Sequence, residues 1–285
     1  MTPDTDPGHD IDLREAINAI SDVVQNRPRP LRRFDQIYMR AGDMVLQSAF
    51  VCDWANAKSI AFLGDGDSIS VCVAYLMARD IVRYGPRKIQ VFDFDERIVG
   101  AINRFADHEA LTDRLEAVLY NCLDPVPAAD SFDCFYTNPP WGASNHGESV
   151  NVFVQRGFEL VQHEGSGLVV VADREDDLPW TSEVLANVQS FAASHGFYVS
   201  RMMQRLHSYH LDDNPELRSC NLVLTSRPDN GRAVESQPIT EQERLRNFYG
   251  EGVEPEVRYI RERKRIDYGK AHDDEYELEM LEGSR

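Results

Sequence analysis

The sequence predicts an α/β fold built on a doubly wound, mostly parallel sheet, and three observations carry this prediction. Apolar strand patterns and amphipathic helix patterns alternate from about residue 59 to residue 195. The last two strand patterns follow each other with no helix between them, which predicts an antiparallel edge. Glycine and acidic residues follow the first two strands, at the carboxyl edge where open α/β sheets bind ligands.

The chain order of the expected elements follows from hydrophobic periodicity. An amphipathic helix at about 11–24 follows an acidic leader and ends at the alternating arginines and prolines of residues 27–30. Strands are expected at residues 59–63, 88–94, 115–120, 132–136, 167–172, 197–204 and 220–225. Further helices are expected at residues 39–54, 68–84, 97–108, 150–161, 181–195 and 240–249.

These elements divide the 285-residue chain into three parts. Residues 1–54 are expected to form a helical N-terminal extension, and residues 55–228 the catalytic α/β domain. Residues 229–285 form a polar, charged C-terminal extension. Apart from its one expected helix, we expect this last part to be a solvated tail, because its composition is charged and poor in apolar residues.

The composition restricts the classes of partner. Asp and Glu number 48 against 30 Lys and Arg, and the net charge of -18 argues against a nucleic-acid partner. The acidity has two explanations, a small cationic partner or a generally acidic surface that serves solubility. No apolar run is long enough to cross a membrane, and the N-terminus has no signal-peptide pattern, so we predict a cytoplasmic protein. The five cysteines form no CxxC pair, and no metal site is expected. A homodimer stays an open alternative.

The first strand ends in Gly64-Asp65-Gly66-Asp67, directly before a helix. Glycines there let the backbone pass close to a bound nucleoside-type cofactor, although the turn lacks the full dinucleotide fingerprint. An acid at the end of the second strand is suited to bind a ribose diol. Asp93 is the first choice for that role and Asp95 the second, with helix capping as the alternative reading of both.

The third and fourth strands are each followed by an amide side chain. Asn121 offers a carbonyl acceptor for an adenine amino group, or it is a turn residue before Pro125. Asn138 begins the segment Asn138-Pro139-Pro140-Trp141, in which two prolines fix the backbone. An amide oxygen accepts a hydrogen bond from an amine and an aromatic face holds a cation, so this segment favours chemistry at an amine. The alternative is a rigid surface turn.

The order and spacing of these segments resemble the branched-chain polyamine synthases. The matching segments are residues 34–36, 62–68, 91–99, 120–127, 132–142 and 153–160. The resemblance runs from about Leu31 to Thr225. It implies a Rossmann-like, S-adenosylmethionine-dependent methyltransferase fold, with decarboxylated S-adenosylmethionine as the aminopropyl donor. His207 and Tyr209 stand where the family has a loop that carries His and Tyr, and we expect both to contact the substrate. This chain departs from the family pattern at Gly66, Asn121 and Asn138, where the family has acids.

The donor and the transferred group have two readings. Asp65 and Asp67 would pair with the amine of the decarboxylated donor and repel the carboxylate of S-adenosylmethionine itself, at roughly 4 kcal/mol per close charge pair before desolvation. The Asn138 segment is also typical of N-methyltransferases that use S-adenosylmethionine and act on an amine or amide nitrogen. We therefore predict an aminopropyltransferase acting on a polyamine nitrogen, with N-methyl transfer as the alternative.

The predicted mechanism assigns a role to each residue of the site. Gly64 and Gly66 would flank the donor, and Pro139 and Pro140 would contact the acceptor amine. Asn138 would orient the attacking nitrogen and also contact the donor. Asp67, or alternatively Asp65, would hold a neighbouring ammonium or take the proton through water, and Trp141 would cover the cationic centre.

Overall fold

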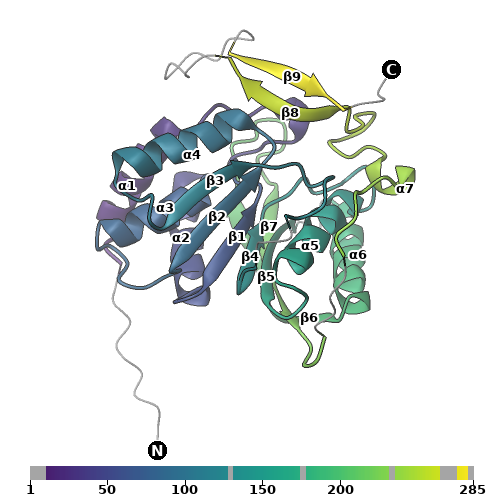
Figure 1. Cartoon of the computed structure of the whole chain (residues 1–285), viewed down its shortest axis with the longest axis horizontal. Helices are drawn as coiled ribbons and strands as arrows, with labels where there is room; N and C mark the ends of the chain where they lie inside the picture. The colour runs from purple at the N-terminus through teal and green to yellow at the C-terminus, as the bar shows by residue number, and fades with distance from the viewer. Residues whose placement is uncertain (1–10, 128–130, 174–177, 231–234, 264–274, 282–285) are drawn as a thin grey trace, which may run out of the picture.

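The computed structural model describes residues 11–127, 131–173, 178–230, 235–263 and 275–281. Its centre is a seven-stranded sheet in the order β3-β2-β1-β4-β5-β7-β6 (Figure 1). The strands are β1 (Ser59–Leu63), β2 (Lys88–Asp93), β3 (Leu115–Leu119), β4 (Cys134–Thr137), β5 (Ser166–Ala172), β6 (Phe197–Ser208) and β7 (Arg218–Ser226). β1 to β5 pair in parallel, and β7 pairs antiparallel with β5 and β6. The predicted fold class, including the antiparallel edge, is confirmed.

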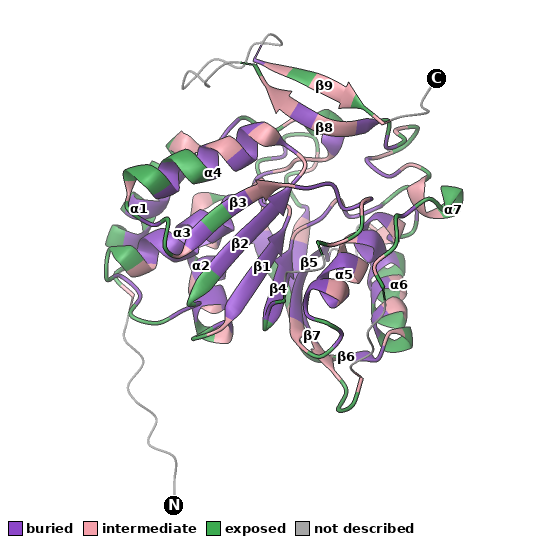
Figure 2. Ribbon diagram, in the orientation of Figure 1, coloured by how far each residue is buried: buried purple, intermediate pink, exposed green. Residues whose placement is uncertain are grey.

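Helices cover both faces of the sheet. The larger helices are α1 (Leu13–Asn26), α2 (Ala41–Trp54), α3 (Ile69–Ala78), α4 (Glu96–His108), α5 (Glu148–Leu160) and α6 (Trp180–Ser194). Ile60 and Phe62 of β1 face a core shared with α1 to α4, whereas Ala61 and Leu63 face a core shared with α5 and α6. This alternation is the period-two pattern of a strand that is buried on both faces, and Figure 2 draws β1 in the colour of buried residues.

Two helices are shorter than the sequence predicts. The pattern at 68–84 predicts a helix to Tyr84, but α3 ends at Ala78 because Asp80 takes a left-handed backbone (φ 55°). The N–H groups of Ile81 and Val82 then turn back to the carbonyl of Leu76. The helix expected at 240–249 is reduced to α7 (Gln242–Leu245), after which Phe248 and Tyr249 turn inward and are buried.

The C-terminal part is not a solvated tail where the structure describes it. β8 (Val257–Glu262) and β9 (Tyr276–Met280) pair as an antiparallel ribbon that lies over α4, and Figure 1 places the ribbon beyond the carboxyl edge of the sheet. Val257 and Ile260 are fully buried. The prediction of a solvated tail is therefore wrong for these segments, and the boundaries at residues 54 and 228 stay a prediction. The acidic run at residues 273–275 lies outside the described residues except for Glu275.

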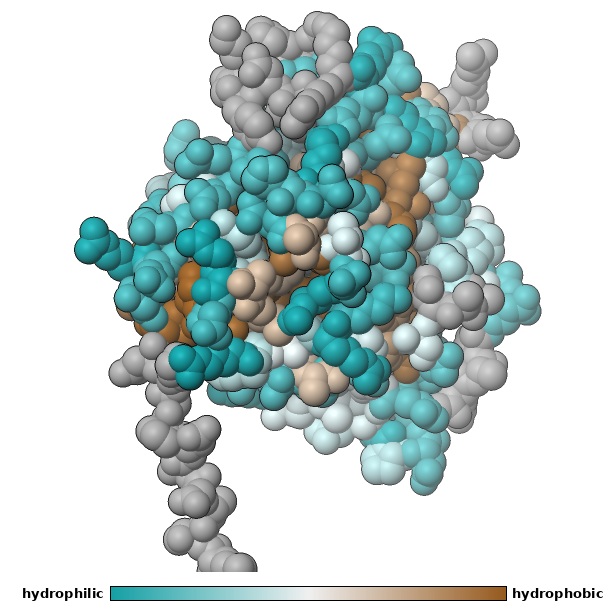
Figure 3. All heavy atoms as spheres, turned by 60° about the vertical axis from the view of Figure 1, so that its left-hand side comes forward, coloured by the Kyte–Doolittle hydropathy of each residue, from teal (hydrophilic) through white to brown (hydrophobic). Residues whose placement is uncertain are grey.

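The surface agrees with the high content of charged residues, which make up 27% of the sequence. On the face drawn in Figure 3, hydrophilic side chains cover most of the area and hydrophobic ones show between them. No helix among the described residues is long and apolar enough to span a membrane. All five cysteines are buried and free.

Candidate active site

A pocket opens at the carboxyl edge of the parallel strands, where the loops after β1, β2, β3 and β4 meet. Its open volume is about 960 Å³, solvent-facing space included, which is enough for a nucleoside with a further chain. The segment before α2 and an inward-turned tyrosine near the C-terminus complete the wall. The residues that line the pocket include Asp35, Gly64, Asp65, Gly66, Asp67, Asp93, Phe94, Asn121, Asn138, Pro139, Pro140, Trp141, Phe153 and Tyr249.

The loop after β1 approaches its neighbours closely, as the glycines predict. Gly64 has a left-handed backbone (φ 71°), and a Cβ at that position would lie 3.6 Å from the ring of Phe153. A Cβ on Gly66 would lie 3.2 Å from the ring of Tyr38, tighter than an ordinary contact. Both glycines line the pocket, so larger side chains there would narrow the space that a ligand can enter.

The Asp65 carboxylate is hydrogen-bonded to the first residues of α3. It accepts hydrogen bonds from the backbone N–H groups of Ile69 (2.9 Å) and Ser70 (3.1 Å), and from the Ser70 hydroxyl. Burial raises the pKa of Asp65 well above its usual value. A carboxylate already held by three donors has little capacity for a substrate ammonium, so the geometry favours helix capping over ammonium binding at Asp65.

Asp67 is also buried, and it joins three segments. It accepts the backbone N–H of Met39 (2.6 Å) and the side-chain N–H of Asn138 (2.8 Å). Arg27, from the end of α1, lies 4.0 Å from the Asp67 carboxylate and donates to the Asp67 backbone carbonyl (3.0 Å). Burial raises the pKa of Asp67, and Arg27 opposes that shift. The charge of Asp67 is therefore countered from within the protein.

The two acids after β2 have different surroundings. Asp93 lines the pocket and accepts the backbone N–H groups of Asp65 and Asp95, each at 2.9 Å. Burial raises the pKa of Asp93 to about 7, and the neighbouring Asp95 adds to the shift. Asp95 is outside the pocket lining, caps α4 and pairs with buried Arg97. The geometry thus favours Asp93 over Asp95 as the ribose-binding acid.

Asn121 lines the pocket, but its side chain is engaged elsewhere. Its Nδ2 donates to the carbonyl of Arg258 in β8 (2.7 Å), and its Oδ1 accepts the N–H of Leu123 (2.9 Å). The turn-residue reading therefore describes the Asn121 side chain better than the adenine-contact reading. Asp124 pairs with Arg258 at 3.0 Å and does not line the pocket.

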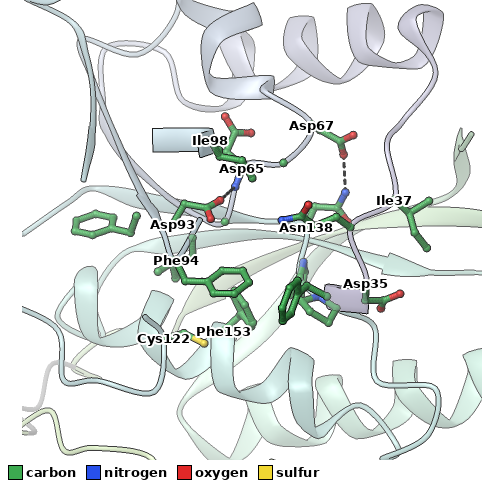
Figure 4. Close-up of a pocket in the computed structure, with 18 of the residues that line it drawn as sticks. Asp35, Ile37, Asp65, Asp67, Asp93, Phe94, Ile98, Cys122, Asn138 and Phe153 are labelled. Carbon is green, nitrogen blue, oxygen red and sulfur yellow. Dashed lines mark hydrogen bonds between the residues drawn. The ribbon is translucent and has the colours of Figure 1, made fainter. Parts of the chain in front are cut away.

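Asn138 is fixed in orientation by Asp67. A carboxylate only accepts hydrogen bonds, so the Asn138 NH₂ group must face Asp67, and the amide oxygen points away from that carboxylate. Figure 4 shows this bond as a dashed line between Asn138 and Asp67. Trp141 donates its Nε1–H to the carbonyl of Val170 (3.2 Å), which holds the indole against the sheet. The Asn138 segment is therefore a rigid wall whose amide side chain is held by Asp67 and contacts Tyr209.

His207 and Tyr209 lie behind this wall rather than in the pocket. Both ring nitrogens of His207 have partners, Ser219 at 2.8 Å and Gln47 at 2.9 Å, and burial lowers its pKa to about 4. The hydroxyl of Tyr209 also meets Ser219 (2.7 Å), and its ring packs edge-on against Trp141 with centroids 5.1 Å apart. This geometry does not support the predicted substrate contact of either residue, because their polar atoms are hydrogen-bonded to other buried side chains.

Three parts of the wall were not assigned a role from the sequence. Asp35 lies in the segment at 34–36 that carries the family resemblance, which was its one signal. The rings of Phe94 and Tyr249 are stacked at 5.8 Å, although 155 residues separate them in sequence. Phe153 comes from α5. Nothing in the local sequence of Tyr249 indicates that it returns to the pocket. Among the described residues, no group of three metal-ligating side chains gathers.

The fold and the pocket together define a methyltransferase-like protein with a nucleoside-sized site at the carboxyl edge of its sheet. Comparison with known proteins then gives the family. Residues 15–281 match the family description of the branched-chain polyamine synthase A C-terminal domain, and the chain belongs to this family.

Curated relatives carry the same family's activity in their names. The N(4)-bis(aminopropyl)spermidine synthase of Thermococcus kodakarensis is 29% identical over 175 residues, which are 60% of this chain and 46% of the relative. The synthase of the same name from Thermus thermophilus is 28% identical over 191 residues, 65% of this chain and 50% of the relative. The chain thus spans about half the length of the relatives it matches.

Solved structures agree with the fold. A mutein of the branched-chain polyamine synthase from Thermus thermophilus, in complex with N4-aminopropylspermidine and 5'-methylthioadenosine, superposes with a TM-score of 0.65. It is 22% identical, with 80% of this chain and 67% of that chain covered. A putative RNA methyltransferase from Pyrococcus horikoshii gives a TM-score of 0.56 at 14% identity, covering 75% of this chain and 98% of that one. Both likenesses establish a methyltransferase-like fold.

Proposed function

We propose that this protein transfers an aminopropyl group from decarboxylated S-adenosylmethionine to a nitrogen of a polyamine. The observation that carries the proposal is that one pocket holds Asp93, suited to a ribose diol, together with Asn138, whose amide group Asp67 orients. Family membership across residues 15–281 supports the same reaction class. The acidic surface suits a cationic acceptor and opposes a nucleic acid.

The donor site fits its ligand on features of this chain. Asp93 retains acceptor capacity beyond its two backbone N–H partners, so it can take hydrogen bonds from ribose hydroxyls. Phe94 and Tyr249 supply an aromatic surface beside it, and Gly64 keeps the backbone close. When bound, the sulfonium of the donor supplies the electrophilic carbon.

The acceptor nitrogen attacks that carbon with its lone pair. A carbon–nitrogen bond forms, the carbon–sulfur bond breaks and its electrons stay on sulfur, which becomes the neutral thioether of methylthioadenosine. The amide oxygen of Asn138 accepts an N–H of the neutral attacking amine and so aims its lone pair. Pro139 and Pro140 fix the backbone around Asn138. The proton that the new ammonium loses passes to water.

For the remaining site residues, the contacts in the structure support other roles than those predicted from the sequence. Asp67 holds Asn138 in place and is itself balanced by Arg27, so its first role is to position the amide. Asp65 supports α3. Trp141 closes the wall, and its buried indole limits how far it can cover a cationic centre. Selection of the decarboxylated donor by Asp65 and Asp67 stays a prediction, as do a cytoplasmic location and a homodimer.

N-methyl transfer from S-adenosylmethionine is the second candidate, and the Asn138-Pro139-Pro140-Trp141 segment is the observation that favours it. Titration calorimetry with three ligands separates the two. We expect methylthioadenosine and decarboxylated S-adenosylmethionine to bind, and intact S-adenosylmethionine to bind more weakly. Preferred binding of intact S-adenosylmethionine would favour methyl transfer. Absence of binding by all three would contradict any transferase that uses an S-adenosyl donor.

A further inference from the structure

Asp35 differs from the other acids of the pocket in how its carboxylate is used. Asp65, Asp67 and Asp93 each accept two or more hydrogen bonds that hold the loops together. The Asp35 side chain has the backbone N–H of Trp141 as its donor and Arg32 as a nearby charge. A carboxylate has about four acceptor sites, so Asp35 keeps most of its capacity.

The backbone around Asp35 fixes where this carboxylate lies. Asp35 ends the short helix η1 (Arg32–Phe34) in a left-handed conformation, with φ 55° and ψ 25°. Its N–H donates to the carbonyl of Arg32 (3.1 Å). The link to the Trp141 N–H then ties the side chain to the Asn138-Pro139-Pro140-Trp141 wall. Figure 4 places Asp35 on the side of Asn138 and Ile37, with Asp93 and Phe94 at the opposite side.

The charged groups near Asp35 only partly neutralise its carboxylate. Burial raises its pKa to about 6, and Arg32 only partly offsets that shift. Arg32 itself is half-exposed and lies 3.6 Å from Asp213, so its charge is shared with a second acid. A partly desolvated carboxylate whose counter-charge is half-exposed and shared with a second acid gains from an ammonium ligand more than a solvated one does.

We propose that Asp35 binds a non-reacting ammonium group of the acceptor and thereby selects amines that carry a second positive charge. This inference rests on the proposed polyamine transfer and deepens it. One nitrogen would meet the amide oxygen of Asn138, while the next ammonium along the chain would lie against Asp35. The methylene groups between them would pass over Ile37 and the proline wall. Asp35 thus takes the role predicted for Asp67, whose charge Arg27 already balances.

The test compares acceptors that differ in charge. Asp35→Asn removes the charge, and Asp35→Gly removes the whole side chain at a position whose left-handed backbone suits glycine. Two variants are used so that the test still works if one of them fails to fold. Asp53→Asn removes one negative charge from an exposed position of α2 and is the matched control. Steady-state kinetics with spermidine, a diamine and a monoamine would be measured, together with the Kd values of methylthioadenosine and decarboxylated S-adenosylmethionine.

We expect both Asp35 variants to raise KM for spermidine and the diamine by about 10- to 100-fold, the range of a hydrogen bond to a charged group. KM for the monoamine and both Kd values should stay within about twofold, and Asp53→Asn should match the wild type. Unchanged KM for spermidine, or an equal loss of methylthioadenosine binding, would overturn the role of Asp35. If the wild type transfers nothing to any amine, the proposed function fails instead, which is a different result.

Discussion

Arg27 is the counter-charge on which the buried acid Asp67 depends, and replacing it by methionine tests this dependence. Arg27→Met keeps much of the aliphatic volume over the ring of Tyr38, where the guanidinium now lies 4.2 Å from the centroid. It removes the positive charge 4.0 Å from the Asp67 carboxylate and the hydrogen bond to the Asp67 carbonyl. Both side chains are almost fully buried, so water cannot replace the lost charge.

The size of the effect follows from the distance. Two unit charges 4.0 Å apart at an effective dielectric near 20 interact by about 4 kcal/mol, and breaking a buried pair by removing one partner costs about 3–5 kcal/mol. We expect Arg27→Met to lower the free energy of unfolding by about 3 kcal/mol at pH 8. Arg14→Met, which removes a charge from the exposed face of α1, should change it by less than about 0.5 kcal/mol.

The pH dependence separates a charge effect from lost packing. Burial already raises the folded-state pKa of Asp67, and removing Arg27 raises it further. A raised acid pKa stabilises the folded state at low pH and costs stability as pH rises. The loss in Arg27→Met should therefore be largest at pH 8 and shrink as pH falls toward about 4.

Urea denaturation of wild type, Arg27→Met, Asp67→Asn and the double variant at pH 8 and pH 5 measures all of this. We expect the double variant to be more stable than the sum of the single losses predicts, because the unpaired charge is gone. Additive losses that do not change with pH would refute the charge argument.

Three further predictions follow from the fold and the site. Gly157→Ala would push a Cβ into the ring of Phe135 and should cost about 1–3 kcal/mol in urea denaturation, whereas Gly42→Ala, with nothing within 4 Å, should cost none. Asn138→Ala should lower kcat about 10- to 100-fold with little change in the Kd of methylthioadenosine. Asp93→Ala should mainly raise the Kd of methylthioadenosine. The reverse pattern would contradict the assigned roles. Calorimetry should find weaker methylthioadenosine binding as pH falls through about 7, where Asp93 takes up a proton and loses acceptor capacity; a flat profile from pH 6 to 8 would count against it.

The central strands of the sheet were predictable because they are short and buried on both faces, as in β1, β4 and β5. Phe62 and Leu63 lie in β1 as expected, and the loop that follows carries its glycines to the pocket. The β8–β9 ribbon was missed because charged residues interrupt its apolar ones. They pair across the two strands, Arg261 with Glu279 and Arg263 with Glu277, and a ladder of alternating charges looks like a solvated tail in a single sequence.

The sequence predicted where the site lies better than it predicted the role of each residue in it. Parallel strands end at one edge, so the prediction that the segments around Asp65, Asp93 and Asn138 gather there agrees with the pocket. Which acids are already used by the fold depends on partners distant in sequence, such as Arg27 for Asp67. The contribution of Asp35 depends on a left-handed turn that periodicity does not reveal.

The measurement that tests aminopropyl transfer most directly is product analysis with the purified protein. Decarboxylated S-adenosylmethionine and spermidine would be incubated with the chain, and methylthioadenosine and polyamine products would be followed by chromatography and mass spectrometry. We predict one methylthioadenosine for each aminopropyl group added to spermidine, with both products forming about 10- to 100-fold more slowly in Asn138→Ala. A methylated amine formed from S-adenosylmethionine, with no methylthioadenosine released from the decarboxylated donor, would contradict the proposed function.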